Sequence, residues 1–136
     1  MNASDTLAHL NWLAVLLATL AGFATGGLWY GPLFGKAWMK ASGVTEAQAR
    51  ARDPARVYGP TVLLNLVAAT SLAMFVGGGD LQFGLFAGFM TGATFVATAL
   101  GVTFLFEGRP LSLWLIDAGY QTLNFTVMGG ILGSWH

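Results

Sequence analysis

The chain contains no cysteine, which excludes disulfides, thiolate catalysis and thiolate metal ligands. Charge is almost as scarce, because Asp, Glu, Lys and Arg make up 9% of the 136 residues, against about a quarter of a typical soluble domain. The few basic residues are not interleaved with aromatic ones on a soluble face, so we expect no nucleic-acid partner. With 55% hydrophobic residues, the composition indicates an integral membrane protein whose surroundings are the lipid bilayer.

Apolar runs occupy most of the chain, and each is long enough to cross a bilayer at about 20 residues per membrane helix. They cover residues 7–30, 57–76, 81–106 and 111–133. No length remains for a soluble domain, so we expect a single domain over residues 1–136 with an all-α fold, a four-transmembrane-helix bundle. The segment before the first run carries Asp5 and no basic residue, so we expect no cleaved signal peptide.

All the basic residues lie in the connections at one end of the expected bundle. They are Lys36, Lys40, Arg50, Arg52 and Arg56 after the first run, and Arg109 after the third. The positive-inside rule makes this end cytoplasmic and places both termini and the turn at residues 77–80 outside, an N-out and C-out topology. We therefore expect a multi-pass membrane protein in this orientation. Aromatic anchors cluster at the same boundary, namely Trp29, Tyr30, Trp38, Tyr58 and Trp114.

The connection at residues 31–56 is the one sizeable segment outside the expected spans. Gly31 and Pro32 predict that the first helix stops after Tyr30. The apolar and basic residues at 33–40 then predict a short interfacial helix on the membrane surface. The segment from Thr45 to Gln48 has the pattern of a capping box, which predicts another short helix that ends before Asp53 and Pro54. A regulatory lipid or nucleotide site is the alternative role for these basic residues.

Small residues recur at intervals of four and predict faces on which helices pack closely. These ridges are Ala14, Ala18, Gly22 and Gly26 in the first run, Gly84, Gly88 and Gly92 in the third, and Gly129 and Gly133 in the fourth. Three ridges exceed what one small bundle needs internally. We therefore expect two of them to pack inside the bundle and one to contact another molecule, in a homo-oligomer or a larger membrane complex.

Asp117 lies inside the fourth apolar run, where a carboxylate is costly and is therefore expected to face a protein interior or a cavity. Gln121 and Asn124 fall within about 60° of it on one helical face. Asn65, Thr25 and Thr98 are expected at similar depth on the other three helices, which predicts a buried polar layer. The candidate counter-ions for Asp117 are Lys36, Arg56 and Arg109, reaching in from the inner surface.

This layer has three interpretations. Asp117 could be salt-bridged, or neutral and hydrogen-bonded to Asn65, as a structural link between helices. It could instead bind a proton or cation in a transport pathway. Catalysis is the third, but the chain has no Gly-x-Ser-x-Gly, no His-Glu-x-x-His and no Cys–His pair, and His9 and His136 are expected at the opposite end. We therefore predict no enzyme, no cofactor and no metal site.

Two segments, WYGPLFGKAW at residues 29–38 and LWLIDAGY at residues 113–120, resemble a bacterial family of small four-span membrane proteins classed as a domain of unknown function. The resemblance implies the four-span fold and no particular reaction. Small multidrug transporters have similar length, but they carry their essential acid in the first span, and residues 7–30 contain none. We predict a non-enzymatic protein that binds or moves a proton, cation or small solute at Asp117, with an accessory or assembly subunit of a larger membrane complex as the alternative.

Overall fold

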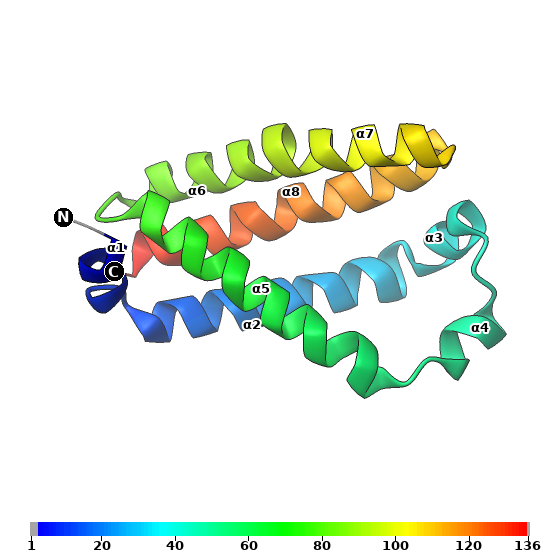
Figure 1. Ribbon diagram of the computed structural model, residues 1–136, viewed down its shortest axis with the longest axis horizontal. Coiled ribbons are helices and arrows are strands. Elements are labelled where there is room, and N and C mark those ends of the chain that lie inside the picture. Colours follow the sequence, from blue (N-terminus) through cyan, green and yellow to red (C-terminus); the bar gives the residue numbers. More distant parts are fainter. Residues whose placement is uncertain (1–2, 136) are drawn as a thin grey trace.

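The computed structural model describes residues 3–135, and all the regular elements of this part of the chain are helices (Figure 1). The prediction of an all-α fold is confirmed over this range. Three helical rods are long and apolar enough to cross a membrane, namely Trp12–Leu33, Pro54–Val76 and Leu81–Glu107. Met1, Asn2 and His136 lie outside the described residues, so the prediction that His136 is at the outer end stays a prediction.

The first long helix begins later than residue 7. A short helix, α1 (Ala3–Ala8), comes first, and α2 (Trp12–Leu28) follows after a break. Asn11 caps α2, since its side-chain oxygen accepts a hydrogen bond from the backbone N–H of Ala14 at 3.2 Å. A capping side chain satisfies one of the amide donors that a helix start leaves unpaired, so Asn11 fixes this boundary more strongly than the apolar run does.

The prediction that Gly31 and Pro32 stop the first helix is wrong. The chain continues as a π-helical turn, η1 (Trp29–Leu33), in which the backbone N–H of Phe34 donates to the Trp29 carbonyl at 2.7 Å. Proline lacks the amide hydrogen of an ordinary helical turn, and the wider π turn lets the helix pass it before the chain bends at Phe34. The next helix, α3 (Gly35–Ser42), starts on a glycine because a Cβ there would lie 2.5 Å from the Tyr30 carbonyl oxygen.

The capping box is confirmed at α4 (Glu46–Ala51). The Thr45 hydroxyl accepts from the Gln48 backbone N–H at 3.1 Å, and the Gln48 side chain accepts from the Thr45 N–H at 3.0 Å. The expected end before Asp53 and Pro54 is also confirmed. The following helix, α5 (Pro54–Val76), begins with Pro54 at its first turn and Asp53 as its cap, three residues before the predicted start at residue 57.

The third long rod consists of α6 (Leu81–Met90), the π-helical η2 (Thr91–Val96) and α7 (Ala97–Glu107), and α8 (Leu111–Ser134) returns along it. Cβ atoms added to Gly84 or Gly88 would lie less than 3.0 Å from the carbonyl oxygens of Gly129 and Phe125 on α8. A Cβ on Gly92 would lie 2.6 Å from the Thr122 Cα. The two backbones are therefore in contact, as close packing on glycine faces allows.

The ridge on α2 also faces inward, because Ala18 is fully buried, Gly22 lies against Asn65 and Asn124, and Gly26 lies against Tyr120. All three small-residue ridges thus pack within one molecule. The expectation that one of them contacts another molecule is wrong for these faces, because the packing of α8 against α2 and α6 occupies them.

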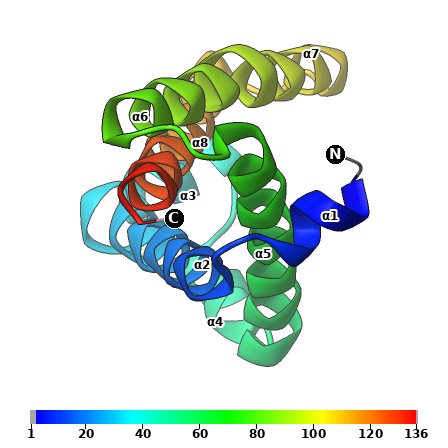
Figure 2. The ribbon, with the colours of Figure 1, turned by 90° about the vertical axis from the view of Figure 1, so that its left-hand side faces the viewer.

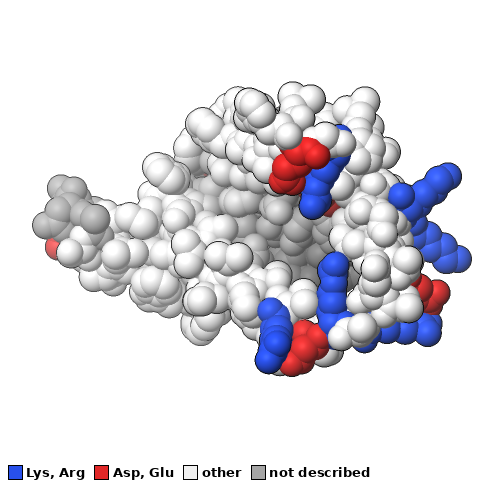
Figure 3. All heavy atoms as spheres, turned by 45° about the vertical axis from the view of Figure 1, so that its right-hand side comes forward, with Lys and Arg blue, Asp and Glu red and all other residues white. Residues whose placement is uncertain are grey.

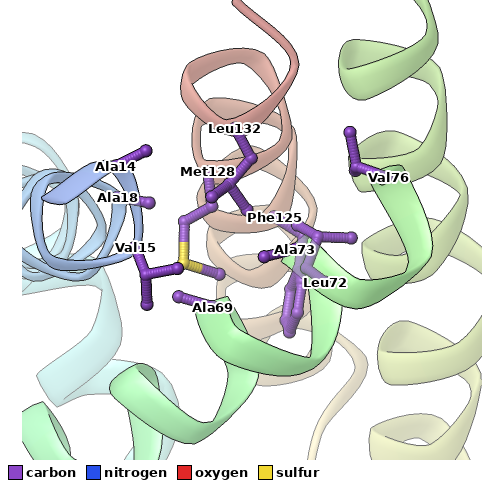
Figure 4. Packing of buried hydrophobic residues seen from close by; sticks show 10 residues of the cluster. All are labelled: Ala14, Val15, Ala18, Ala69, Leu72, Ala73, Val76, Phe125, Met128 and Leu132. Carbon is purple, nitrogen blue, oxygen red and sulfur yellow. The ribbon is translucent and has the colours of Figure 1, made fainter. Parts of the chain in front are cut away.

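The buried apolar core lies at the end of the bundle where α2, α5 and α8 converge (Figure 4). Its members are Ala14, Val15, Ala18, Ala69, Leu72, Ala73, Val76, Phe125, Met128 and Leu132. From this end α5 diverges from α8 toward the opposite end, where α3 and α4 lie (Figure 1). The end-on view shows the rod of α6 and α7 on the side of α8 opposite α2 (Figure 2). The bundle is therefore closed at one end and splayed at the other.

Candidate functional site

Asp117 on α8 is paired with Tyr30 of the π-helical turn. The Tyr30 hydroxyl donates a hydrogen bond to Asp117 Oδ1, with an oxygen–oxygen distance of 2.7 Å. The neighbouring Trp29 also reaches α8, where its indole N–H donates to the Ile116 carbonyl at 3.0 Å. The wide turn therefore places two consecutive aromatic side chains against the same stretch of α8, and both side chains are half-buried.

Tyr120 extends this contact to α2. Its ring meets the Tyr30 ring edge to face, with centroids 5.2 Å apart, and its hydroxyl donates to the Gly22 carbonyl at 3.1 Å. A Cβ on Gly26 would lie 3.0 Å from the Tyr120 hydroxyl oxygen, so α2 approaches this ring closely because it has glycine there. The segments 29–38 and 113–120, far apart in the sequence, thus form one interface.

Asn65 and Asn124 form a second polar contact, about 10 Å along α8 from Asp117 at 1.5 Å per residue. The Asn65 amide donates to the Thr19 carbonyl at 2.9 Å, and the Asn124 amide donates to Asn65 Oδ1 at 3.2 Å. Asn124 is 2% exposed, and its Oδ1 has no hydrogen-bond partner among the described residues. These bonds connect α2, α5 and α8. The structural link predicted for Asp117 is therefore made by Asn65 and Asn124, and Asp117 does not bond to Asn65.

The predicted polar layer includes two threonines that the structure places differently. Thr98 is exposed on α7, and its hydroxyl donates to the carbonyls of Thr94 and Phe95 in its own helix. It does not belong to the site. Thr25 is half-buried, and its hydroxyl donates to the Ala21 carbonyl of α2 at 2.8 Å. A threonine hydroxyl in an apolar helix can donate to a backbone carbonyl of the preceding turn. The depth of Thr25 in the membrane therefore does not predict its hydrogen-bond partner.

The predicted counter-ions do not pair with Asp117. Arg56 lies 3.8 Å from Asp53, and Arg109 lies 3.2 Å from Glu107 with its guanidinium over the Phe104 ring. Lys36 is exposed and forms no ion pair with any residue that the structure describes. Arg56 and Arg109 pair with nearby surface carboxylates because long basic side chains keep their charged ends in solvent. The partner of Asp117 is thus a neutral hydroxyl and not a cation.

A pocket of about 660 Å³ lies at the splayed end, and Asp117 is in its wall. The lining residues that carry polar or aromatic groups are Tyr30, Trp38, Arg50, Arg52, Tyr58, Asp117 and Gln121. A second pocket of about 620 Å³ shares Tyr30, Val57 and Tyr58 and extends to Asn65 and Tyr120. The surface at this end is hollowed, with Lys and Arg side chains around the rim (Figure 3). Asp117 and Gln121 are therefore accessible from the basic end of the molecule.

The described part of the chain contains no group of three or more His, Asp or Glu side chains that could hold a metal ion. A carboxylate with one hydroxyl donor can instead bind a proton, an ammonium group or a polar solute, because its remaining lone pairs accept hydrogen bonds.

A family model described as "Protein of unknown function (DUF1761)" matches residues 13–133. The chain belongs to this family. The match covers nearly the whole chain, including both segments that meet at Tyr30 and Asp117, and it confirms the expectation of a family classed as a domain of unknown function. No curated protein and no solved structure matches this DUF1761 chain in the corresponding comparisons.

The main site residue that the sequence reasoning missed in this DUF1761 chain is Tyr30, which was expected to anchor the chain at the membrane interface. A local signal existed, since Gly31 and Pro32 next to a tyrosine permit a π turn that redirects the side chain inward. Arg50 and Arg52 were assigned to the cytoplasmic connection and not to the site. Their place in the pocket wall depends on where the connection that carries α4 lies in space, which no local pattern specifies.

Proposed function

We propose that this protein spans the membrane four times, N-out and C-out in a bacterial inner membrane, and moves a small polar solute or cation through a site at Asp117. The observation that carries the proposal is a half-buried carboxylate with a hydroxyl partner, lying in the wall of a pocket that opens at the basic end. Ionisable groups at membrane depth are costly, face the bundle interior or a cavity, and mark ion and solute pathways.

The position of α8 supports a fourth span, although its Asp117, Gln121 and Asn124 make it less apolar than the other three rods. It packs along the whole rod Leu81–Glu107, from the backbone contact of Gly84 with Gly129 to the hydrogen bond from the Trp114 indole to the Ala97 carbonyl at 2.8 Å. A helix that follows a spanning rod over its full length crosses the same bilayer. Its neighbours shield its polar residues from lipid, as the bilayer requires.

The apolar core supports transport over binding alone. A pocket of about 300 Å³ lies at the closed end, and Ala14, Ala73 and Leu132 of the core line it. The core thus separates this pocket from the larger one that reaches Asp117. A solute site open to one side and closed to the other is the arrangement that alternating access requires.

We infer a non-enzymatic role, which the sequence supports because it carries no Gly-x-Ser-x-Gly, no His-Glu-x-x-His and no Cys–His pair. The Tyr30 hydroxyl fixes one oxygen of Asp117, which suits a carboxylate that binds a ligand.

The test is flux through the purified protein in liposomes. Proton flux would be recorded with a trapped pH dye under an imposed membrane potential, and uptake from a mixture of small polar solutes would be recorded by mass spectrometry. We expect flux above that of empty liposomes, lost in Asp117→Asn and retained in Glu107→Gln, a control carboxylate that is exposed beside Arg109. Absence of flux in the wild type, or equal flux in a folded Asp117→Asn variant, would overturn the proposal.

The alternative role, an accessory subunit of a larger membrane complex, depended on a glycine ridge free to bind a partner. The ridges pack inside the molecule, so such a complex would have to use another surface. Gentle extraction from native membranes followed by native mass spectrometry separates the two roles. A mass at a multiple of 14.3 kDa supports a homo-oligomer, and stoichiometric foreign subunits support the accessory role.

A further inference from the structure

We propose that the pocket at Asp117 binds a small zwitterion, an inference that rests on the proposed solute site. The ammonium end of the ligand lies at Asp117 and Tyr30, and its anionic end lies at Arg52. The argument starts from the charges that line a single pocket. Asp117, Arg50 and Arg52 all contribute to its wall, yet no ion pair joins Asp117 to either arginine. Opposite charges held apart across one cavity leave a field that a dipolar ligand complements.

The two arginines differ in what they offer a ligand. Arg50 is paired with Glu46 one turn earlier on α4, so a carboxylate already accompanies this guanidinium. Arg52 forms no ion pair with any residue between 3 and 135. It is exposed at the end of α4 and remains in the wall of the pocket. Arg52 is therefore the basic group available to an anionic end.

The aromatic residues favour an ammonium group at the other end. Tyr30, Trp38 and Tyr58 line the same pocket as Asp117. The Tyr30 and Trp38 rings are nearly perpendicular, at 80°, with centroids 6.1 Å apart. The two rings thus contact each other edge to face and both line the pocket, and ammonium ions bind to aromatic faces beside a carboxylate. The carboxylate and the rings thus form a cation-binding corner.

Size and charge together exclude simpler ligands. A volume of about 660 Å³ is within the range of small-molecule sites and exceeds what a bare ion fills. A simple cation would meet repulsion from Arg52, and a simple anion would meet repulsion from Asp117. A molecule that carries both charges pairs with both groups. The pocket would therefore bind a zwitterion more tightly than a ligand with only one of the two charges.

The binding experiment uses protein in nanodiscs of phosphatidylglycerol, whose headgroup is not zwitterionic. The probes are trimethylammonio carboxylates with one, two or three methylenes between the charges, choline as the matched cation, and 3,3-dimethylbutanoate as the matched anion. Tryptophan fluorescence reports binding, because Trp38 lines the pocket. We expect one zwitterion to bind about tenfold or more tightly than choline and 3,3-dimethylbutanoate.

Variants assign the two ends. We expect Asp117→Asn to abolish binding of the zwitterion. We expect Arg52→Gln to weaken binding of the zwitterion about tenfold and to strengthen binding of choline, because the repulsion from Arg52 is removed. Arg56→Gln is the matched control, since Arg56 is paired with Asp53 and does not line the pocket. Equal affinity for choline and all the zwitterions, still dependent on Asp117, would overturn the zwitterion inference and leave the solute site standing. No binding of any probe, with flux that depends on Asp117, would also overturn the inference alone.

The zwitterion could be a free solute or the headgroup of a lipid. Nanodiscs that contain phosphatidylethanolamine distinguish these sources. Loss of the zwitterion signal in these discs supports the inference with a lipid headgroup as the ligand, and an unchanged signal supports it with a free solute.

Discussion

At the scale of single residues, the Tyr30 hydroxyl holds one oxygen of Asp117, and the other oxygen has no hydrogen-bond partner within residues 3–135. The free oxygen belongs to a carboxylate that lines the pocket with Gln121. A hydroxyl neighbour fixes the carboxylate without neutralising it, whereas an arginine would have occupied it with a salt bridge. Asp117 is therefore oriented and still available to a ligand.

Replacing Tyr30 with phenylalanine tests this role. The change keeps the ring contacts with Trp38 and Tyr120 and removes the hydrogen bond to Asp117, so we expect a stability loss of about 1–2 kcal/mol and reduced flux. Thermal unfolding in detergent and the liposome assay measure the two effects. Tyr58→Phe is the control, because the Tyr58 hydroxyl makes no hydrogen bond to the described residues. Equal behaviour of the two variants would count against the assigned role of Tyr30.

Asn65 carries the structural link, so its replacement should act on stability. Asn65→Leu removes the bonds to Thr19 and Asn124 and leaves the Asn124 amide buried without an acceptor, at a cost of about 1–3 kcal/mol. Thr61→Val is the matched control one turn earlier on α5, where the hydroxyl bonds only to its own helix. Unfolding in graded SDS measures both variants, and an undiminished stability of Asn65→Leu would contradict a structural link at this residue.

At the scale of helices, the contact between α6 and α8 depends on glycine. Without a Cβ at Gly84, Gly88 and Gly129, the two backbones approach within contact distance, which brings many atoms together along the pair. The pairing places α8 between α6 and α2, with its polar face toward α2 and α5. Glycine packing on one side of α8 thus determines where Asp117 and Asn124 point on the other.

Gly88→Ala tests this dependence. Its Cβ would lie less than 3.0 Å from the Phe125 carbonyl, so the helices must separate, and we expect a loss of about 2 kcal/mol or more. Gly27→Ala on α2 is the control, because a Cβ at Gly27 meets no atom within 4 Å. The SDS unfolding midpoints of the two variants measure the difference in stability. A Gly88→Ala protein as stable as the control would show that α6 and α8 do not pack through this glycine.

Some local elements were predictable from the sequence, whereas the ends of the first long helix and the contacts between elements were not. The capping box of Thr45 and Gln48 and the boundary at Asp53 and Pro54 follow from residues three or fewer apart. The bond from Tyr30 to Asp117 joins residues 87 apart, and it depends on a π turn that a rule for proline in α-helices does not anticipate. Asp117 and Gln121 line one pocket, whereas Asn124 bonds to Asn65, and these partners depend on how α2 and α5 cross.

At the scale of the whole molecule, the absence of cysteine allows the proposed topology to be tested with single introduced thiols. We expect Ala47→Cys on α4 to react with an impermeant maleimide from the cytoplasmic side. Gly78→Cys and Ser134→Cys should react from the outer side, because four spans place both the 77–80 turn and the end of α8 there. Intact cells and inverted vesicles supply the two sides. Reaction of Ser134→Cys from the same side as Ala47→Cys would contradict the fourth span.

The closed end of the bundle has a mechanical consequence. Where α2 meets α5, the core consists largely of Ala14, Ala18, Ala69 and Ala73, with Val15 beside them. Alanine has no side-chain torsion to rotate, and valine is restricted to few rotamers, so the flexible side chain between α2 and α5 is that of Met128 from α8, which lies between Val15 and Ala69 (Figure 4). A rotamer change of Met128 leaves the alanine contacts in place, so an opening at this end also requires tilting or sliding of α2 and α5 as rigid rods, a shear motion.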